Sequence, residues 1–307
     1  MDDNGLVNLF LASYGLSSSE FEPLGGGLSS FTLLVKTSDG KRVMKIADKD
    51  SNLATEINLG NYLYLQGIPT AKVIKNKEGG TTTYIDDSIG ALFGFCDGEP
   101  ITWGNLSEGF SKNTAGLIAK MHLTMLESVD ISAKDYSGCN LYSLDGVTNK
   151  KIAEQYELIA SDVRDIDFSG MRRVLIHGDL TRKNILIGDD RKTVSAVIDF
   201  GDAHYDFIVW DLAVMITHVF ITKTYGIDRE ALKIFFEEYN RLLPLSRKEK
   251  NAIIPFIKAR NINLAIEVNR TKKTEENAEE LLSIENSVIT KLNLIQEAKE
   301  ELKNIFN

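Results

Sequence analysis

The sequence predicts an α+β fold, with a strand-rich N-terminal region followed by a mainly helical remainder. Short apolar runs separated by turn residues fill the first hundred positions, as in an antiparallel sheet, and longer helical segments follow from about Ile101. The third observation that predicts this fold is a polar loop over 177–184, which lies between short apolar runs. A chain of 307 residues has room for roughly two domains of about 150 residues each, and we place them at 1–96 and 97–307.

The elements of the N-terminal region can be assigned in order. A short apolar helix is expected over 4–14, and a second helix over 51–66 ends at Gly67, with Pro69 soon after as a stop signal. Strand composition marks the segments 31–37, 42–46, 81–85 and 91–96. These segments predict an antiparallel sheet with one helix, closed by a turn near Cys96.

The most informative segment is His177-Gly-Asp-Leu-Thr-Arg-Lys-Asn184, followed by Asp199 in Ile-Asp-Phe-Gly-Asp. Apolar runs over 174–176, 185–187 and 194–198 read as short strands, and the last two form a hairpin. The hairpin returns Asp199 to the end of the sheet where Asn184 began, so the two side chains should converge.

Three side chains of this segment suit phosphoryl transfer, which requires positioning and neutralisation of phosphate charge more than covalent chemistry. Asp179 can accept a proton from the attacking hydroxyl group or orient it. Asn184 and Asp199 supply the oxygen ligands that Mg²⁺ binds beside nucleotide phosphates. The alternative is a hairpin whose loop carboxylates are only solvated.

This segment resembles the aminoglycoside phosphotransferase/choline kinase-like superfamily, the small-molecule relatives of protein kinases. Gly178 stands where protein kinases usually carry arginine, which points to a metabolite or antibiotic as the acceptor. The resemblance implies a protein-kinase-like two-lobed fold, ATP or GTP as co-substrate, Mg²⁺ as cofactor and a small-molecule hydroxyl acceptor.

The resemblance also implies roles in the N-terminal lobe. Lys45 would touch the phosphates and Glu56 would pair with it. The backbone of a glycine turn can approach phosphates closely, although this turn is not the G-x-G-x-x-G of protein kinases. The residues expected to bind nucleotide are Gly25, Gly26, Gly27, Ser29, Ser30, Lys45, Glu56 and, through the backbone of the hinge, Phe95 and Cys96.

In the C-terminal lobe, the run 197–205 is similar to the hydroxylysine kinase branch, and the loop is similar to type II homoserine kinases. An amino acid or amino alcohol is therefore the expected acceptor, with Asp202, His204 and Arg260 as candidate substrate residues. For Arg260, which the resemblance suggests as a carboxylate partner, the alternative is an ordinary helix-surface arginine. We call residues 177–184 the catalytic loop, and Asp211 is expected to brace it.

Two other functions stay open. An aminoglycoside O-phosphotransferase could use the acidic run 275–280 to recognise amines, although such a run is usually a solvated helix face. A nucleotide-binding pseudokinase is the second alternative, although Asp179, Asn184 and Asp199 are all present.

Bulk composition excludes several classes of protein. A net charge of −9 and a pI near 5.1 argue against a nucleic-acid-binding surface, and Cys96 and Cys139 alone make neither a disulfide framework nor a zinc site. The apolar run 207–222 contains Asp211 and is too short to span a bilayer. The first residues lack the positive region of a signal peptide, so a cytoplasmic location is expected. The oligomeric state is left open.

Overall fold

The computed structural model describes residues 3–16, 20–24, 30–102, 106–127, 130–135, 141–271 and 277–307. The glycine turn 25–27, Ser29 and Cys139 lie outside these ranges, and Ser30 is the first residue of a strand. Predictions on the glycine turn and on Ser29 therefore stay predictions.

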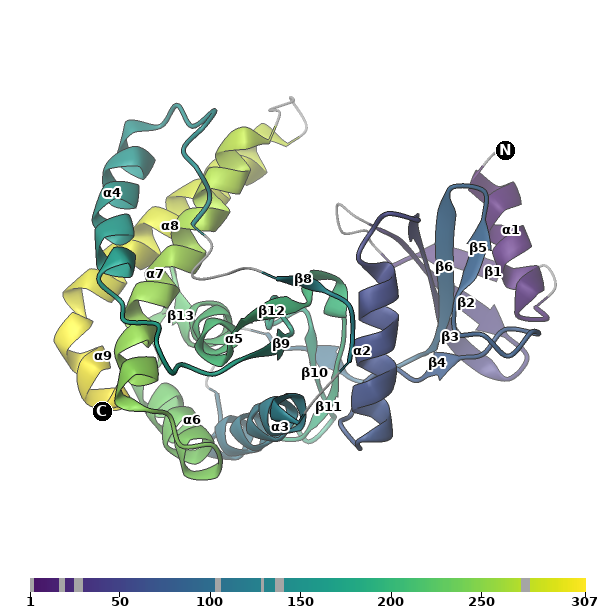
Figure 1. Cartoon of the computed structure of the whole chain (residues 1–307), viewed down its shortest axis with the longest axis horizontal. Helices are drawn as coiled ribbons and strands as arrows, with labels where there is room; N and C mark the ends of the chain where they lie inside the picture. Colours follow the sequence, from purple (N-terminus) through teal and green to yellow (C-terminus); the bar gives the residue numbers. More distant parts are fainter. Residues whose placement is uncertain are drawn as a thin grey trace.

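A six-stranded antiparallel sheet forms the N-terminal lobe, as expected (Figure 1). Its strands follow the order β1-β2-β3-β6-β4, and β5 pairs with β6. Their bounds are β1 (Glu20–Pro23), β2 (Ser30–Thr37), β3 (Gly40–Asp48), β4 (Val73–Ile74), β5 (Thr83–Ile85) and β6 (Ser88–Gly94).

One helix packs on each face of this sheet, α1 (Asp3–Ser13) and α2 (Leu53–Leu65) (Figure 1). Successive side chains of a strand point to opposite faces, so Met44 packs with α1 while its neighbour Lys45 faces α2. The expected helix over 51–66 is α2. The expected helix over 4–14 is α1, so two helices flank the sheet, where the predicted fold counted one beside it.

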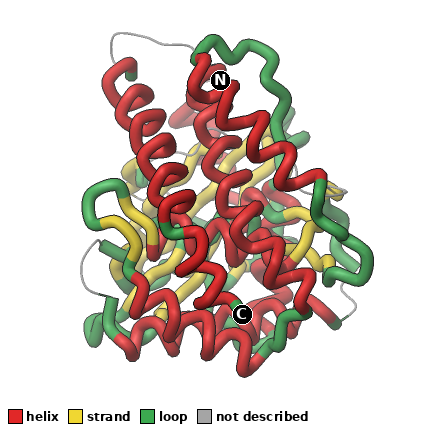
Figure 2. Tube along the Cα trace, turned by 90° about the vertical axis from the view of Figure 1, so that its left-hand side faces the viewer, coloured by secondary structure: helices red, strands yellow, loops and turns green. Residues whose placement is uncertain are grey.

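The C-terminal lobe is mainly helical, and Figure 2 shows its helices in front of short strands. The helices are α3 (Glu108–Leu126), α4 (Lys150–Arg164), α5 (Ile208–Met215), α6 (Arg229–Leu242), α7 (Arg247–Arg270), α8 (Ala278–Glu297) and α9 (Lys299–Phe306). A π-helical turn, η2 (Ile216–Phe220), continues α5. No helix in the described ranges is both long and apolar enough to cross a membrane.

Short strands position the loops of this lobe in three small sheets. One has the order β11-β10-β7, the second β8-β12-β9, and the third pairs β13 with β14. The strands are β7 (Glu99–Pro100), β8 (Lys134–Asp135), β9 (Arg173–Ile176), β10 (Ile185–Ile187), β11 (Val194–Val197), β12 (His204–Phe207), β13 (Ile221–Thr222) and β14 (Gly226–Ile227).

A continuous apolar core joins these elements around α5 and α7. All eight residues of α5 are buried, because this helix is apolar on every side except at Asp211. The longer α7 begins with a capping box, in which the Ser246 side chain and Glu249 satisfy each other's backbone N–H groups. These two helices support the loops that carry Asp179 and Asp199.

Candidate active site

The predicted hairpin is present and brings Asn184 beside Asp199. Strands β10 and β11 pair antiparallel, with Ile185 opposite Val197. Beyond that pair, the backbone N–H of Ile198 donates to the carbonyl oxygen of Asn184 at 2.9 Å. The two expected metal ligands therefore lie at the same end of one hairpin.

Asn184 is also bonded to Asp179. Its amide nitrogen donates to the carbonyl oxygen and to Oδ2 of Asp179, both at 2.9 Å. Because the nitrogen faces Asp179, the amide oxygen points away from that residue. The loop thus fixes the Asp179 carboxylate. It leaves the amide oxygen of Asn184, on the opposite side, as a candidate metal ligand.

Arg260 reaches the other oxygen of Asp179. Its Nη2 lies 3.2 Å from Asp179 Oδ1, and the arginine side chain is only 17% exposed. The alternative of an ordinary helix-surface arginine is therefore wrong. Burial raises the pKa of Asp179, and Arg260 acts against that rise.

Lys45 links the two lobes through a pair of carboxylates. Its Nζ lies 2.5 Å from Glu56 on α2 and 2.8 Å from Asp199. Burial opposes the charged form of Lys45, but the two carboxylates prevail and raise its pKa. The predicted Lys45–Glu56 pair is present, and Asp199 of the C-terminal lobe forms a second ion pair with the same lysine.

Asp199 sits in an uncommon backbone conformation, with φ 67° and ψ 70°. This left-handed region is sparsely populated by residues other than glycine, and outliers of this kind cluster at functional sites. Its carboxylate is 52% exposed, and Lys45 lowers its pKa against the effect of partial burial. Asp199 is therefore held as an anion at the junction of the lobes.

Asp211 braces the catalytic loop, as expected. Its carboxylate is fully buried and accepts the backbone N–H groups of His177 and Gly178, each at 2.8 Å. His122 Nε2 lies 3.2 Å from the same carboxylate, and its other ring nitrogen lies 2.7 Å from the Tyr239 hydroxyl.

Asp202, His204 and Arg260 meet at one polar cavity of about 170 Å³, beside Gly178. The ring of His204 is buried, with Nδ1 2.6 Å from the carbonyl oxygen of Asp202 and Nε2 3.6 Å from the Asp206 carboxylate. Asp202 itself is exposed. Of the three predicted substrate residues, Arg260 alone contacts Asp179 among the described interactions.

Two further residues of this cavity, Asn263 and Glu267, were not predicted. They follow Arg260 by three and seven positions on α7, so all three share one face of that helix. That spacing is visible in the sequence and would have identified them once Arg260 was taken as a site residue.

Phe95 and Cys96 lie in the short segment between β6 of the N-terminal sheet and β7, which pairs with β10. Both residues are half-buried, and Lys41 Nζ lies 5.1 Å from the centre of the Phe95 ring. The segment therefore connects the two lobes at the predicted position of the hinge.

A family model described as the phosphotransferase enzyme family matches residues 20–245. The chain belongs to this family. It is a small-molecule kinase, a phosphotransferase that acts on hydroxyl groups, and the prediction of this class is confirmed.

Relatives and solved structures agree with the fold of this phosphotransferase. A homoserine kinase from Methylobacillus flagellatus is 23% identical over 249 residues, which cover 76% of this chain and 74% of the relative. A hydroxylysine kinase from Bos taurus is 25% identical over 254 residues, covering 68% and 66% respectively.

Among solved structures, a microcompartment-associated aminopropanol kinase superposes with a TM-score of 0.78 at 14% identity, covering 99% of this chain and 100% of the other. An amicoumacin kinase, hAmiN, in complex with AMP-PNP, Ca²⁺ and Ami has a TM-score of 0.75 at 14% identity, covering 93% and 92%. The predicted protein-kinase-like α+β fold is confirmed.

Proposed function

We propose that this enzyme transfers the γ-phosphoryl group of ATP or GTP to a hydroxyl group of an amino acid, an amino alcohol or a related metabolite, with Mg²⁺ bound. One observation carries the proposal: the bonded pairs Asp179–Asn184 and Lys45–Asp199 are linked at the junction of the lobes. The link is the backbone N–H of Ile198, next to Asp199, which donates to the carbonyl oxygen of Asn184. Relatives named homoserine kinase and hydroxylysine kinase support an acceptor of this kind.

On the acceptor side, Asp179 orients the attacking hydroxyl group and takes up its proton. A general base works best when its pKa approaches the working pH, and burial moves the pKa of Asp179 upward. Asn184 and Arg260 each hold one oxygen of the carboxylate, so its direction is set before the acceptor arrives. Such preorganisation lowers the entropic cost of reaching the reactive geometry.

On the nucleotide side, Lys45 neutralises phosphate charge, and Glu56 keeps its ammonium group in place. The phosphates are covered by the glycine turn, through the backbone of Gly25, Gly26 and Gly27 and the hydroxyl groups of Ser29 and Ser30. Backbone groups of the hinge at Phe95 and Cys96 bind the base. The division into a nucleotide-binding lobe, 1–96, and a catalytic and acceptor-binding lobe, 97–307, belongs to the same proposal.

Asn184 and Asp199 would hold the metal ion. An amide oxygen and a carboxylate are suitable ligands for Mg²⁺, which is usually bound through one or two carboxylates together with phosphates. The half-exposed carboxylate of Asp199 and the amide oxygen of Asn184, on the side away from Asp179, fit this donor set. When bound, the ion neutralises charge on the phosphate oxygens.

A coupled assay for release of nucleoside diphosphate tests the proposal, with ATP and GTP in parallel and with Mg²⁺ or excess chelator. The acceptor panel contains homoserine, hydroxylysine, 3-aminopropan-1-ol, ethanolamine, choline and several aminoglycosides. We expect release that depends on Mg²⁺ and on an amino-acid or amino-alcohol acceptor. Release only with an aminoglycoside would replace the proposal with the antibiotic alternative, and release that persists in chelator would remove the metal from it.

Titration calorimetry of Asp199→Ala with nucleotide provides an independent test. We expect the variant to lose most of the Mg²⁺-dependent part of nucleotide affinity, because a metal ligand and a partner of Lys45 are both removed. An unchanged affinity in Mg²⁺ would contradict the role given to Asp199.

A further inference from the structure

A second cavity, of about 310 Å³, lies next to the catalytic loop and is distinct from the polar cavity beside Gly178. Arg182 enters it from that loop, three residues after Asp179. The other walls come from η2, from the β13–β14 hairpin, from α7 and from one face of α8. Its volume is at the lower end of the range for ligand pockets, about 300–1,000 Å³, and suits a small molecule.

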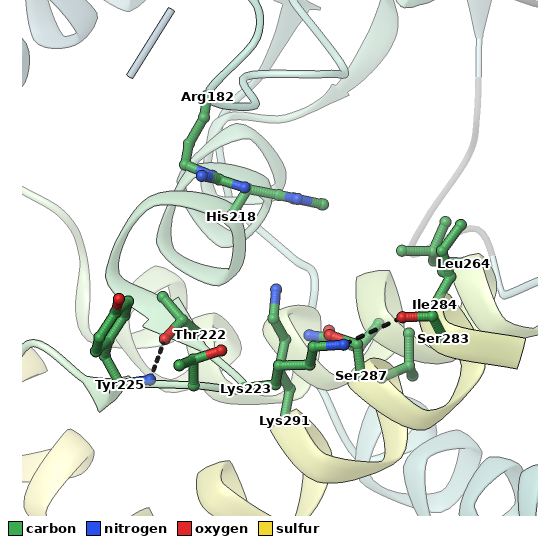
Figure 3. Close-up of a pocket in the computed structure, with 13 residues that line it drawn as sticks. Arg182, His218, Thr222, Lys223, Tyr225, Leu264, Ser283, Ile284, Ser287 and Lys291 are labelled. Atoms are coloured by element: carbon green, nitrogen blue, oxygen red, sulfur yellow. Dashed lines mark hydrogen bonds between the residues drawn. The ribbon is translucent and has the colours of Figure 1, made fainter. Parts of the chain in front are cut away.

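The charges around this cavity have one sign. The cations Arg182, Lys223 and Lys291 line it, and none of the described residues lining it is an aspartate or a glutamate. His218 also lines it, but burial and the neighbouring cations lower its pKa well below the usual value and keep the ring neutral. In a chain with 44 acidic and 35 basic residues, such a grouping is not expected from composition. Figure 3 shows Arg182 and His218 on one side and Lys291 pointing toward them from α8. We call this cavity the cationic pocket.

Lys291 is the most informative member of the cationic pocket. The residue is 8% exposed, and its Nζ donates to the carbonyl oxygen of Thr217 at 2.7 Å, which is a neutral acceptor. Burial, reinforced by Arg182 and Arg260, lowers the pKa of Lys291 to about 8. Burying a cation beside other cations is unfavourable unless an anion compensates it. The pocket is therefore built to gain stability from a bound anion.

The cationic pocket is connected to the reaction site through α7. Asn261 of this helix lines the pocket, and the preceding residue, Arg260, lies 3.2 Å from Asp179. The charge of Arg260 acts on both His218 and Lys291. A small anion in the pocket would therefore act on the same arginine that contacts Asp179.

We propose that the cationic pocket binds a carboxylate group of the acceptor, so the acceptor is a hydroxy acid of amino-acid size. This inference rests on the proposed function and narrows it, because an amino alcohol has no group for the pocket. A polycationic aminoglycoside is disfavoured for the same reason, since like charges facing each other repel.

Binding measurements test the inference separately from catalysis. Titration calorimetry compares homoserine and hydroxylysine, each with the compound that lacks only its carboxyl group, and inorganic phosphate as a simple anion. The proteins are wild type, Lys291→Met, Lys223→Met at the exposed edge of the pocket, and Lys233→Met. Lys233 is 62% exposed on α6 and serves as the matched control. Thermal unfolding of each variant reports whether it folds.

We expect at least one of the two acids to bind wild type about 10-fold or more tightly than its decarboxylated counterpart, as expected for a charge-assisted contact. Lys291→Met should remove that preference, Lys223→Met should reduce it, and Lys233→Met should preserve it. Should Lys291→Met not fold, the reduction in Lys223→Met decides the question.

Three outcomes would each overturn the inference. They are equal binding of the acid and its decarboxylated counterpart, an unchanged preference for the acid in both pocket variants, and tight binding of inorganic phosphate alone. The diphosphate-release assay on the same samples keeps the two proposals apart. Turnover with amino alcohols as good as with acids would preserve the proposed function and reject the carboxylate pocket.

Discussion

The Asp179 carboxylate is held at both oxygens by groups that are far apart in the chain. Asn184 fixes one oxygen from within the loop, and Arg260 approaches the other from α7. Burial raises the pKa of this carboxyl group, which favours its action as a proton acceptor. The side chain contacts neither Lys45 nor Glu56 among the described interactions, so the nucleotide-binding contacts should not depend on it.

We therefore expect Asp179→Ala to lower turnover by about 10²–10⁴-fold, the usual contribution of a positioned general base. The affinity for Mg²⁺-nucleotide should change little, because Lys45, Glu56 and Asp199 keep their contacts. Diphosphate-release kinetics and titration calorimetry measure the two quantities. Asp189→Ala, an exposed aspartate in the turn after β10, is the control. A variant that kept most of its rate would exclude Asp179 as the base.

At the scale of single elements, the catalytic loop is attached to α5 through Asp211 rather than through its own hydrogen bonds alone. The buried carboxylate satisfies two consecutive backbone N–H groups at the start of the loop. Gly178 has φ +82°, and a Cβ there would lie 2.3 Å from the carbonyl oxygen of Asp202. This close approach explains why glycine stands at the position where protein kinases usually carry arginine.

Replacing Asp211 with alanine should destabilise the protein by about 2–6 kcal/mol, because two buried N–H groups would each lose an acceptor at about 1–3 kcal/mol. Asp211→Asn retains one carbonyl oxygen and should cost less. Denaturant unfolding gives both values, and turnover of the folded fraction shows whether the loop has shifted. Equal stability of Asp211→Ala and wild type would mean that the brace does not hold the loop.

At the scale of the whole molecule, α2 connects the lobes. Asn52, just before this helix, makes no side-chain capping bond and instead donates to the carbonyl oxygens of Gly201 and Ala203, at 2.8 and 3.0 Å. Lys45 adds its ion pair with Asp199 across the same junction. The turn proposed to bind the metal ion and the lysine proposed to bind phosphate are thus aligned by contacts between the lobes.

Asn52→Ala should destabilise the protein by about 1–3 kcal/mol, since two hydrogen bonds of about 0.5–1.5 kcal/mol each are lost. It should also raise the KM for nucleotide, because the turn that carries Asp199 is no longer tied to α2. Denaturant unfolding and initial-rate kinetics check these two effects. Asn293→Ala, on an exposed position of α8, should change neither. A normal KM in Asn52→Ala would show that the ion pair alone aligns the lobes.

Much of the site could be predicted from sequence because it depends on residues that are close in the chain. The spacing from Asp179 to Asn184 and the β10–β11 hairpin are local, so the positions of the loop and of Asp199 followed directly. Strand alternation likewise places Lys45 on the face of the sheet that α2 covers. The fold class was predictable for the same reason, together with the motif resemblance.

The Arg260–Asp179 contact and the cationic pocket were not predictable, because they depend on how helices pack and not on local pattern. Arg260 lies 81 residues after Asp179, and nothing in its neighbourhood distinguishes it from a surface arginine until α7 packs beneath the loop. The cationic pocket likewise gathers Arg182, His218 and Lys291 from three elements. A local pattern records which side chains share a face of one element. Which charges face one another across a cavity depends on the packing of several elements, and we propose that this packing selects the acceptor.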